Sequence, residues 1–338
     1  GKDIPLHYMG AVPASETRVQ PALRDSLRVI YLDRVGVKSL APLHPVGFSR
    51  PALAAWSELF VNGRPQRGDL GAVARLERDD NAHGAKLMSN GYRCADDPVR
   101  GGTFRYAGDR PAGWRTGEPL WIAGYFAHGY ADDMLPVAAV DTAARTFTLA
   151  QATMYGLMTG ADYRRWYAVN LLEEVDRPGE YYLDDRHNRI WFYPEGEVRT
   201  LSVSLLGEPL MAIEGVEDVE VRGLTFECSR GIGLSMERTE GVTVRGCCFR
   251  NLGGVAIHVG QGIEPFPGYR HEGKVVPASR MVGNLQQHLY TETTFNGQGG
   301  HNNRIEGCEI QDVGAGGINL CGGDRLTLEP GNNRVENC

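Results

Sequence analysis

The residues of this sequence that could carry out chemistry gather near its C-terminal end. Asp324 follows two glycines, Gly322 and Gly323, and precedes Arg325. The glycines would let the backbone turn tightly and approach a ligand closely, so that a carboxylate and a guanidinium would lie side by side at the turn. A carboxyl group in such a turn fits acid–base or nucleophilic chemistry. The alternative is that Asp324 pairs with Arg325 or caps the turn.

Cleavage of a glycosidic bond is a reaction that such a carboxyl group could serve, and it requires a second one. The two groups lie about 5–5.5 Å apart in enzymes that retain the anomeric configuration and about 6.5–9.5 Å apart in those that invert it. We choose Asp324 as the first catalytic residue. The second stays open among Asp312, Glu309, Glu292, Glu264 and a residue beyond Cys338. For Asp312 the alternative is a turn-forming role.

A repeat in the C-terminal part of the chain determines how these residues would be positioned. The heptad NNRIEGC (302–308) returns as NNRVENC (332–338). An offset of 23 residues superposes Val221 on Val244, and an offset of 61 superposes Val244 on Ile305. In each unit, short runs of alternating apolar and polar residues are separated by Asn- and Gly-rich corners. About 23 residues per turn without a helical segment predict an all-β fold, a parallel β-helix with coils about 4.8 Å apart.

Stacked coils place equivalent side chains above one another. The alternation that turns Ile257 inward turns Ser235, His258 and Asn319 outward, which predicts a polar column on one exterior sheet. We expect His258 and Asn319 to bind substrate on this face, and Arg325 to bind it at the turn that follows.

Two further sets of residues follow from the repeat. The third unit contains an insertion of about 38 residues, at roughly 262–300, which we expect to wall the same face. Its residues His271 and Tyr290 are predicted to bind substrate. Three cysteines would form an inward column of small buried side chains, with a redox or metal role as the alternative: Cys247, Cys308 and Cys338.

An aromatic-rich stretch precedes the repeat. Residues 101–195 hold 17 of the 29 aromatic residues, in short runs bounded by Gly, Pro and Asp. These runs predict antiparallel strands, with a hairpin turn at 184–188. The aromatic side chains fit the core of such a domain better than platforms for sugar rings. Trp114, in the loop DRPAGWRTG, is the better platform candidate.

These patterns divide the chain into three parts. We expect an N-terminal segment, 1–56, that begins the β-helix, an inserted antiparallel β-sandwich-like domain, 57–197, and the coils, 198–338. The sequence stops within the first strand of a coil, so we expect it to be truncated at the C-terminus.

Several motifs follow one another in an order that resembles a known group of proteins. They are SELFVNGRP (57–65), NLLEEVDRPGEYYLDDRHNRIWFYP (170–194), VEVRGLTFECSRG (219–231) and the segment from GCEIQDVG to the last residue. The series resembles the bacterial carbohydrate-active proteins that have a right-handed parallel β-helix with an inserted β-sandwich. Among them are glycoside hydrolases of the β-xylosidase and the α-fucosidase/xylanase types.

The resemblance implies hydrolysis of a polysaccharide or its oligosaccharides by an acidic pair on the exterior of the helix. The resemblance is more specific for the fold than for the sugar substrate, because proteins with the same fold can catalyse unrelated reactions. A polysaccharide lyase with the same fold would require calcium and basic residues that face an acidic glycan. Arg325 and Arg280 are available for that role, yet the chain has only four lysines. A carbohydrate-binding β-helix without activity is the non-enzymatic alternative.

The composition of the chain limits the classes of molecule that it could bind. The net charge of −7 disfavours nucleic acid, and no apolar run approaches the ~18 residues of a membrane span. We expect no cofactor and no zinc, because zinc-site spacing does not occur; calcium is an open alternative that no EF-hand spacing supports. A glycan substrate favours a secreted or periplasmic location, with a signal peptide absent or removed.

Overall fold

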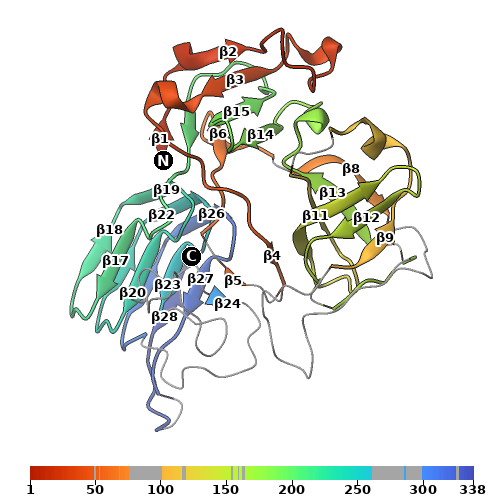
Figure 1. The fold of residues 1–338 in the computed structure, drawn as a ribbon. Coiled ribbons are helices and arrows are strands. Elements are labelled where there is room, and N and C mark those ends of the chain that lie inside the picture. The colour runs from red at the N-terminus through yellow and green to blue at the C-terminus, as the bar shows by residue number, and fades with distance from the viewer. Residues whose placement is uncertain are drawn as a thin grey trace. The chain divides into compact units, whose positions relative to one another are not determined.

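The chain forms two compact units, coloured along the sequence in Figure 1. The computed structural model describes residues 1–48, 51–52, 54–67, 69–75, 101–115, 119–153, 155–158, 160–161, 164–260, 285–286, 299–324 and 327–338. The unit that we call the parallel unit consists of Gly1–Asp3, Pro51–Pro65 and Ser202–Cys338. The antiparallel unit consists of Ile4–Arg50 and Gln66–Leu201.

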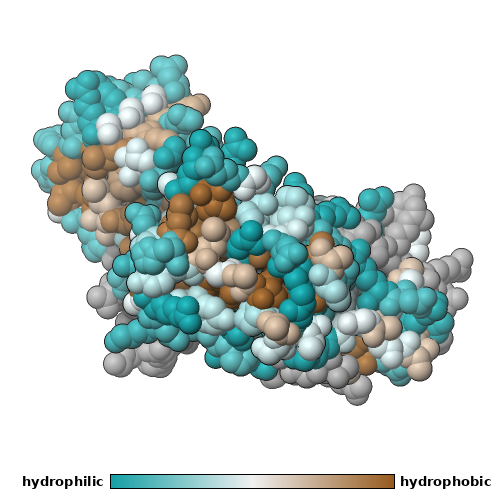
Figure 2. Space-filling view, turned by 90° about the horizontal axis from the view of Figure 1, so that it is seen from above, coloured by the Kyte–Doolittle hydropathy of each residue, from teal (hydrophilic) through white to brown (hydrophobic). Residues whose placement is uncertain are grey.

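Strands dominate the regular structure of both units. The helices of the described residues are all 3₁₀ helices of three or four residues: Leu6–Tyr8, Pro21–Leu23 (η2), Leu32–Val35, Arg110–Gly113 (η4) and Leu172–Glu174 (η5). The all-β prediction is therefore confirmed. Within the described part of the chain, no helix has the length and hydropathy to cross a membrane. Hydrophilic residues cover most of the face seen in Figure 2, and hydrophobic residues reach the surface in smaller areas between them.

Three parallel sheets make up most of the parallel unit. The first contains β17 (Met211–Glu214), β20 (Leu234–Glu237), β23 (Ile257–Val259) and β27 (Ile318–Leu320). The second contains β18 (Glu220–Arg222), β21 (Thr243–Arg245), β25 (Arg304–Glu306) and β28 (Arg334–Glu336). The third contains β19 (Thr225–Ser229), β22 (Cys248–Leu252) and β26 (Glu309–Val313). Along the chain the strands visit the first, second and third sheet in turn and then return to the first.

Two smaller sheets accompany them. One has the strand order β1 (Lys2–Asp3), β16 (Leu201–Val203), β6 (Leu59–Val61) and β7 (Arg64–Pro65). The other pairs β5 (Pro51–Ala52) with β24 (Leu285–Gln286) in antiparallel fashion.

The register of the parallel sheets confirms the offsets of 23 and 61 residues. Val221 pairs with Val244, and Val244 pairs with Ile305. Phe226 pairs with Phe249, and their rings stack at a centroid distance of 4.6 Å and an interplanar angle of 2°. All five side chains are buried in one hydrophobic core. A slip of one residue would turn the apolar column outward, so the burial of this column holds the register.

The strands of the third sheet contain a left-handed residue next to their last residue. Cys228, Asn251 and Asp312 have φ angles of 57°, 55° and 50°. They follow Glu227, Arg250 and Gln311, which pair with one another across the sheet. Asn and Asp tolerate this conformation better than most residues. The predicted alignment of these three residues is therefore confirmed, although they lie within the strands and not at a corner, and the left-handed backbone favours the turn-forming reading of Asp312.

The repeated Asn-Asn pair has a physical explanation. Asn303 is 1% exposed, and its Nδ2 donates to Asn333 Oδ1 at 3.0 Å and to the Gly299 carbonyl at 3.1 Å. Its Oδ1 accepts from the Val242 amide at 3.1 Å. A column of asparagine amides thus satisfies backbone groups at a buried corner, where an unpaired group would be costly.

The cysteine side chains contact the repeat unit that precedes their own. Cys247 Sγ donates to the Val221 carbonyl at 3.6 Å, and Cys308 Sγ to the Val244 carbonyl at 3.7 Å. Both residues are buried, and the described cysteines are free thiols, as predicted for small core side chains. Cys338 Sγ repeats this contact, with the Ile305 carbonyl at 3.6 Å, as the predicted column requires, but the residue is exposed rather than buried.

The described residues of the antiparallel unit form two sheets. The larger has the order β8 (Asp69–Arg75), β13 (Arg165–Val169), β10 (Trp121–Gly124), β11 (Asp133–Asp141), β12 (Thr146–Leu149) and β9 (Thr103–Arg105), with β4 (Val46–Gly47) also on β11. The smaller has the order β14 (Tyr181–Asp184), β15 (Arg189–Phe192), β3 (Arg28–Tyr31) and β2 (Met9–Ala11). The hairpin predicted at 184–188 joins β14 to β15.

Aromatic side chains fill the core of this unit, as predicted. Phe104, Phe126, Phe147, Trp166 and Trp191 are buried in one cluster. Phe147 and Trp166 meet edge to face, with ring centroids 5.0 Å apart. Such pairs stabilise a core beyond the area they bury.

The two units differ from the predicted domains in two places. Residues 4–50, predicted to begin the coils, belong to the antiparallel unit, where β3 pairs with β15 and β2. Residues 57–65, predicted to open the inserted domain, belong to the parallel unit, where Leu59–Val61 is buried. Both differences arise from strands that pair over long sequence separations, which local alternation does not encode.

The asparagine column can be tested by substitution. We expect Asn303→Leu to lower the free energy of unfolding by about 2–4 kcal/mol, because a side chain of similar size would leave several buried polar groups without partners. Urea unfolding followed by circular dichroism measures the change.

Asn302→Gly is the matched control. Asn302 is exposed and has a φ of 57°, which glycine adopts readily. Its replacement should change the free energy of unfolding by less than about 0.5 kcal/mol. Equal effects of the two substitutions would contradict the role assigned to Asn303.

Candidate functional site

One face of the first parallel sheet brings together the polar residues predicted to form a column. Leu234 of β20 is fully buried in the core. Because side chains alternate along a strand, those of Ser235 and Glu237 lie on the opposite face, away from the core. Ser235 pairs with His258, and His258 pairs with Asn319. The register therefore confirms the column, while its role in binding substrate stays a prediction.

This face is more shielded from solvent than the prediction of an exterior column implies. His258 is 2% exposed and Ser235 is buried, whereas Asn319 is partly exposed. Hydrogen bonds to a ligand at this face would be strong, because the local dielectric constant of a shielded site is low.

A pair of carboxyl groups lies beside the column. Glu214, the last residue of β17, pairs in register with Glu237, the last residue of β20. The side chain of Glu214 is 33% exposed, and Glu237 as a residue is 4% exposed. The sequence analysis missed this pair, although the 23-residue offset relates the two positions directly.

Arg238 contacts both members of the pair. Its guanidinium forms an ion pair with Glu237 Oε1, and its Nη2 lies 3.9 Å from Glu214 Oε2. The φ of Arg238 is 51°, so the chain turns sharply directly after Glu237. Glu237 Oε2 is buried and has no hydrogen-bond partner. The site thus offers one carboxylate oxygen that is held next to a guanidinium but is not itself engaged.

Asp324, the first choice for catalysis, lies in a turn after β27. Its backbone N–H donates to the Glu329 carbonyl at 2.9 Å, and its Oδ1 accepts from the Thr327 amide at 3.3 Å. The residue is partly exposed. These contacts match the alternative in which Asp324 caps the turn, and a catalytic role for it stays a prediction.

The other predicted site residues divide into two groups. Asp312 and Glu309 lie on β26, in a different sheet from His258 and Asn319, and Asp312 is exposed. The remaining predicted residues fall outside the described residues: Glu292, Glu264, His271, Tyr290 and Arg325. Among the residues with a described position, no group of three or more His, Cys, Asp or Glu side chains could hold a metal ion.

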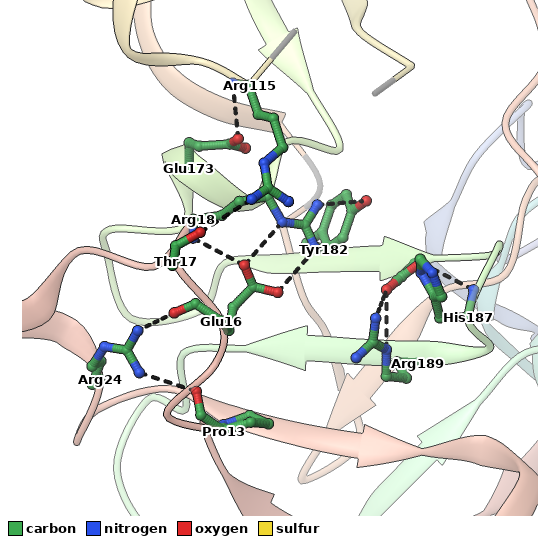
Figure 3. A network of polar contacts seen from close by, with 11 residues as sticks. Pro13, Glu16, Thr17, Arg18, Arg24, Arg115, Glu173, Tyr182, His187 and Arg189 are labelled. Atoms are coloured by element: carbon green, nitrogen blue, oxygen red, sulfur yellow. Dashed lines mark hydrogen bonds and ion pairs between the residues drawn. The ribbon is translucent and has the colours of Figure 1, made fainter. Parts of the chain in front are cut away.

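Trp114, the predicted sugar platform, lines a pocket of about 530 Å³ in the antiparallel unit. The pocket is formed by three segments, 17–21, 110–114 and 173–176. Figure 3 shows part of the polar network at one side of it, where the Arg115 backbone amide donates to Glu173 Oε1 at 3.0 Å.

A buried carboxyl group holds the indole in this pocket. Trp114 Nε1 donates to Glu174 Oε1 at 2.5 Å, and Glu174 is 3% exposed. Arg110 forms ion pairs with Glu174 and with Asp176, the latter at 2.8 Å. Burial raises the pKa of the Glu174 carboxyl, although the hydrogen bond from Trp114 and the charge of Arg110 oppose the rise.

Glu58 is a second titratable group that the sequence analysis did not single out. It precedes β6, and burial raises the pKa of its carboxyl to about 7. Its backbone amide donates to Ser204 Oγ at 2.8 Å. A carboxyl group that keeps its proton close to neutral pH has the acidity that general acids require.

Comparisons with known proteins give little further information. No family model matches the chain, and no curated protein matches it. A solved structure described as "Glycoside hydrolase" is similar, with 13% sequence identity and a TM-score of 0.49. The similarity covers 92% of this chain, which spans 59% of the length of that structure.

The raised pKa of Glu58 predicts a pH-dependent stability. The folded state keeps the proton up to about pH 7, whereas an unfolded glutamate loses it near the ordinary pKa of 4.5. The folded state therefore loses stability relative to the unfolded state as the pH rises from about 4.5 to 7. Glu58→Gln should remove this loss, which would stabilise the protein at pH 8 by up to about 3 kcal/mol.

Thermal unfolding of the protein and of Glu58→Gln between pH 5 and pH 8 measures the effect. Glu220→Gln, at an exposed position of β18, is the control and should follow the unsubstituted protein. A constant difference between Glu58→Gln and the unsubstituted protein across this range would contradict the prediction.

Proposed function

We propose that the chain is a glycoside hydrolase that acts on a polysaccharide or its oligosaccharides, with Glu214 and Glu237 as the catalytic carboxyl groups. The observation that carries the proposal is the register pairing of the two glutamates on neighbouring parallel strands. Such strands lie about 4.8 Å apart. This spacing is close to the ~5–5.5 Å that separates the carboxyl groups of retaining glycosidases.

The order of sequence motifs supports the same class. It resembles carbohydrate-active proteins in which a β-helix carries the chemistry, and we propose accordingly that the three parallel sheets are the faces of a right-handed parallel β-helix. The fixed order in which the chain visits the sheets supports this architecture.

The two glutamates differ in a way that suits two roles. Glu237 is buried beside Arg238, with which it forms an ion pair, and its Oε2 makes no hydrogen bond. In the proposal, Glu237 Oε2 forms a bond to the anomeric carbon as the bond from that carbon to the glycosidic oxygen breaks. Glu214, which is more exposed, gives its proton to the departing oxygen.

The second step releases the enzyme. A water molecule gives a proton to Glu214, and its oxygen forms a bond to the anomeric carbon as the bond to Glu237 breaks. His258 and Asn319, on the same face of the sheet, would donate hydrogen bonds to hydroxyl groups of the sugar. The net result is retention of the anomeric configuration.

Substitution of the pair tests this function. We expect Glu237→Gln to lower kcat/KM for a hydrolysed glycan by at least ~100-fold, because an amide cannot act as the nucleophile. Glu214→Gln should lower it comparably for natural glycans but much less for aryl glycosides, whose leaving groups need no proton. Reducing-sugar assays on a panel of neutral and acidic glycans, with nitrophenyl glycosides in parallel, measure both effects.

Two controls separate this site from other possibilities. Glu240→Gln alters a glutamate whose side chain is 45% exposed, and it should leave hydrolysis unchanged. Asp324→Asn tests the residue chosen from the sequence. Full activity of Glu237→Gln together with an inactive, normally folded Asp324→Asn would move the catalytic centre to the turn after β27. Unsaturated products from a uronic-acid polymer would indicate a lyase.

A further inference from the structure

The pocket beside Trp114 is a preorganised site that the proposed hydrolytic reaction does not use. It draws on the loop before η2, on η4 and on η5, three segments that are far apart in the sequence. Its volume of about 530 Å³ lies within the range of small-molecule sites, which is roughly 300–1,000 Å³. The three segments are tied together by polar contacts rather than by backbone pairing alone.

The indole of Trp114 is fixed in one orientation. It lies nearly parallel to the Phe147 ring, at 9° and a centroid distance of 6.1 Å, and nearly perpendicular to the Trp166 ring, at 85°. Its Nε1 donates to the buried Glu174. An aromatic ring held by a core and by a hydrogen bond offers a rigid apolar surface. Little side-chain entropy would therefore be lost when a ligand binds to it.

The lining also contains a carboxylate, that of Asp176, with one oxygen that makes no hydrogen bond. Asp176 Oδ2 pairs with Arg110 at 2.8 Å, while Asp176 Oδ1 is buried and has no hydrogen-bond partner. Arg177 Nε lies 3.5 Å from Oδ1 without making a hydrogen bond. Buried polar atoms without partners are rare, and one in the wall of a pocket is suited to accept a hydrogen bond from a ligand.

The charges of the lining define the class of ligand. The lining contains two guanidinium groups, those of Arg18 and Arg110, and three carboxylates, those of Glu173, Glu174 and Asp176. Arg18 is further paired with Glu16 at 3.2 Å and donates to Tyr182 Oη at 3.4 Å, as Figure 3 shows. The guanidinium groups are therefore already neutralised, which disfavours phosphates, sulfates and uronates.

We propose that this pocket binds a neutral sugar residue, with Trp114 against its apolar face and Asp176 and Arg110 on its hydroxyl groups. A pyranose has the required combination of a C–H face and peripheral hydroxyl donors, whereas a purely apolar ligand would leave Asp176 Oδ1 without a hydrogen bond. The choice of a sugar rests on the proposed function, because a hydrolase of glycans gains affinity from a second contact with the same polymer. The antiparallel unit thus carries a carbohydrate-binding site.

Titration calorimetry with neutral oligosaccharides tests the site in the full chain. The parent is Glu237→Gln, so that binding is measured without hydrolysis, and the probes are xylo-, cello- and manno-oligosaccharides with an oligogalacturonate as the charged comparison. We expect binding of a neutral probe to a site that Trp114→Ala weakens by about tenfold or more. Asp176→Asn, which preserves size, should weaken the same site by several-fold.

Tyr130→Ala is the matched control, because this aromatic side chain of the same unit is 62% exposed and lies outside the pocket lining. It should leave binding unchanged, and thermal unfolding verifies that each variant folds. Unchanged affinity in both Trp114→Ala and Asp176→Asn would overturn the proposal, as would tighter binding of the oligogalacturonate. Loss of neutral-sugar binding in these variants of a chain that hydrolyses no glycan would support the pocket and reject the hydrolase.

Discussion

The vertical register between successive strands of the parallel unit is the constraint on which the remaining features of that unit depend. Backbone hydrogen bonds run from each strand to the next, and the buried column of Val221, Val244 and Ile305 prevents a slip of one residue. When this column is buried, the sequence offset between the repeat units determines which outward side chains lie next to each other on adjacent strands. The asparagine amides and cysteine thiols inside the corners strengthen the same register, because each satisfies a backbone group of an adjacent coil.

The register also explains why two glutamates come together. Glu214 and Glu237 occupy the same position of neighbouring strands, where like charges would repel each other without compensation. Arg238 supplies that compensation from a left-handed residue directly after Glu237. Burying a carboxylate beside a single guanidinium costs desolvation free energy. A pair of apolar side chains at these positions would stabilise the fold at a lower cost. This cost is the physical argument for a functional role.

The sequence predicts features that repeat locally and misses those that depend on distant pairing. Alternation and the 23-residue offset predict the strands, the inward column and the polar column of His258 and Asn319. The same offset relates Glu214 to Glu237, so this pair is predictable from the sequence, whereas the glycines before Asp324 indicate only a turn. The place of residues 4–50 could not be predicted, because β3 joins β15 across more than a hundred residues of chain. The contacts of Trp114 could not be predicted for the same reason, because its hydrogen-bond partner Glu174 lies 60 positions away in the sequence.

One connection between strands of the parallel unit accommodates a change of length without a change of register. Val221 and Val244 are 23 positions apart and Val244 and Ile305 are 61 apart, yet both pairs are direct neighbours in the same sheet. The additional residues fall between β23 and β25 in the sequence, and the strands on either side keep the same neighbours. Modular architecture of this kind lets specificity evolve by insertion and deletion while the scaffold persists. For protein engineering, this connection is the natural place to graft a foreign segment.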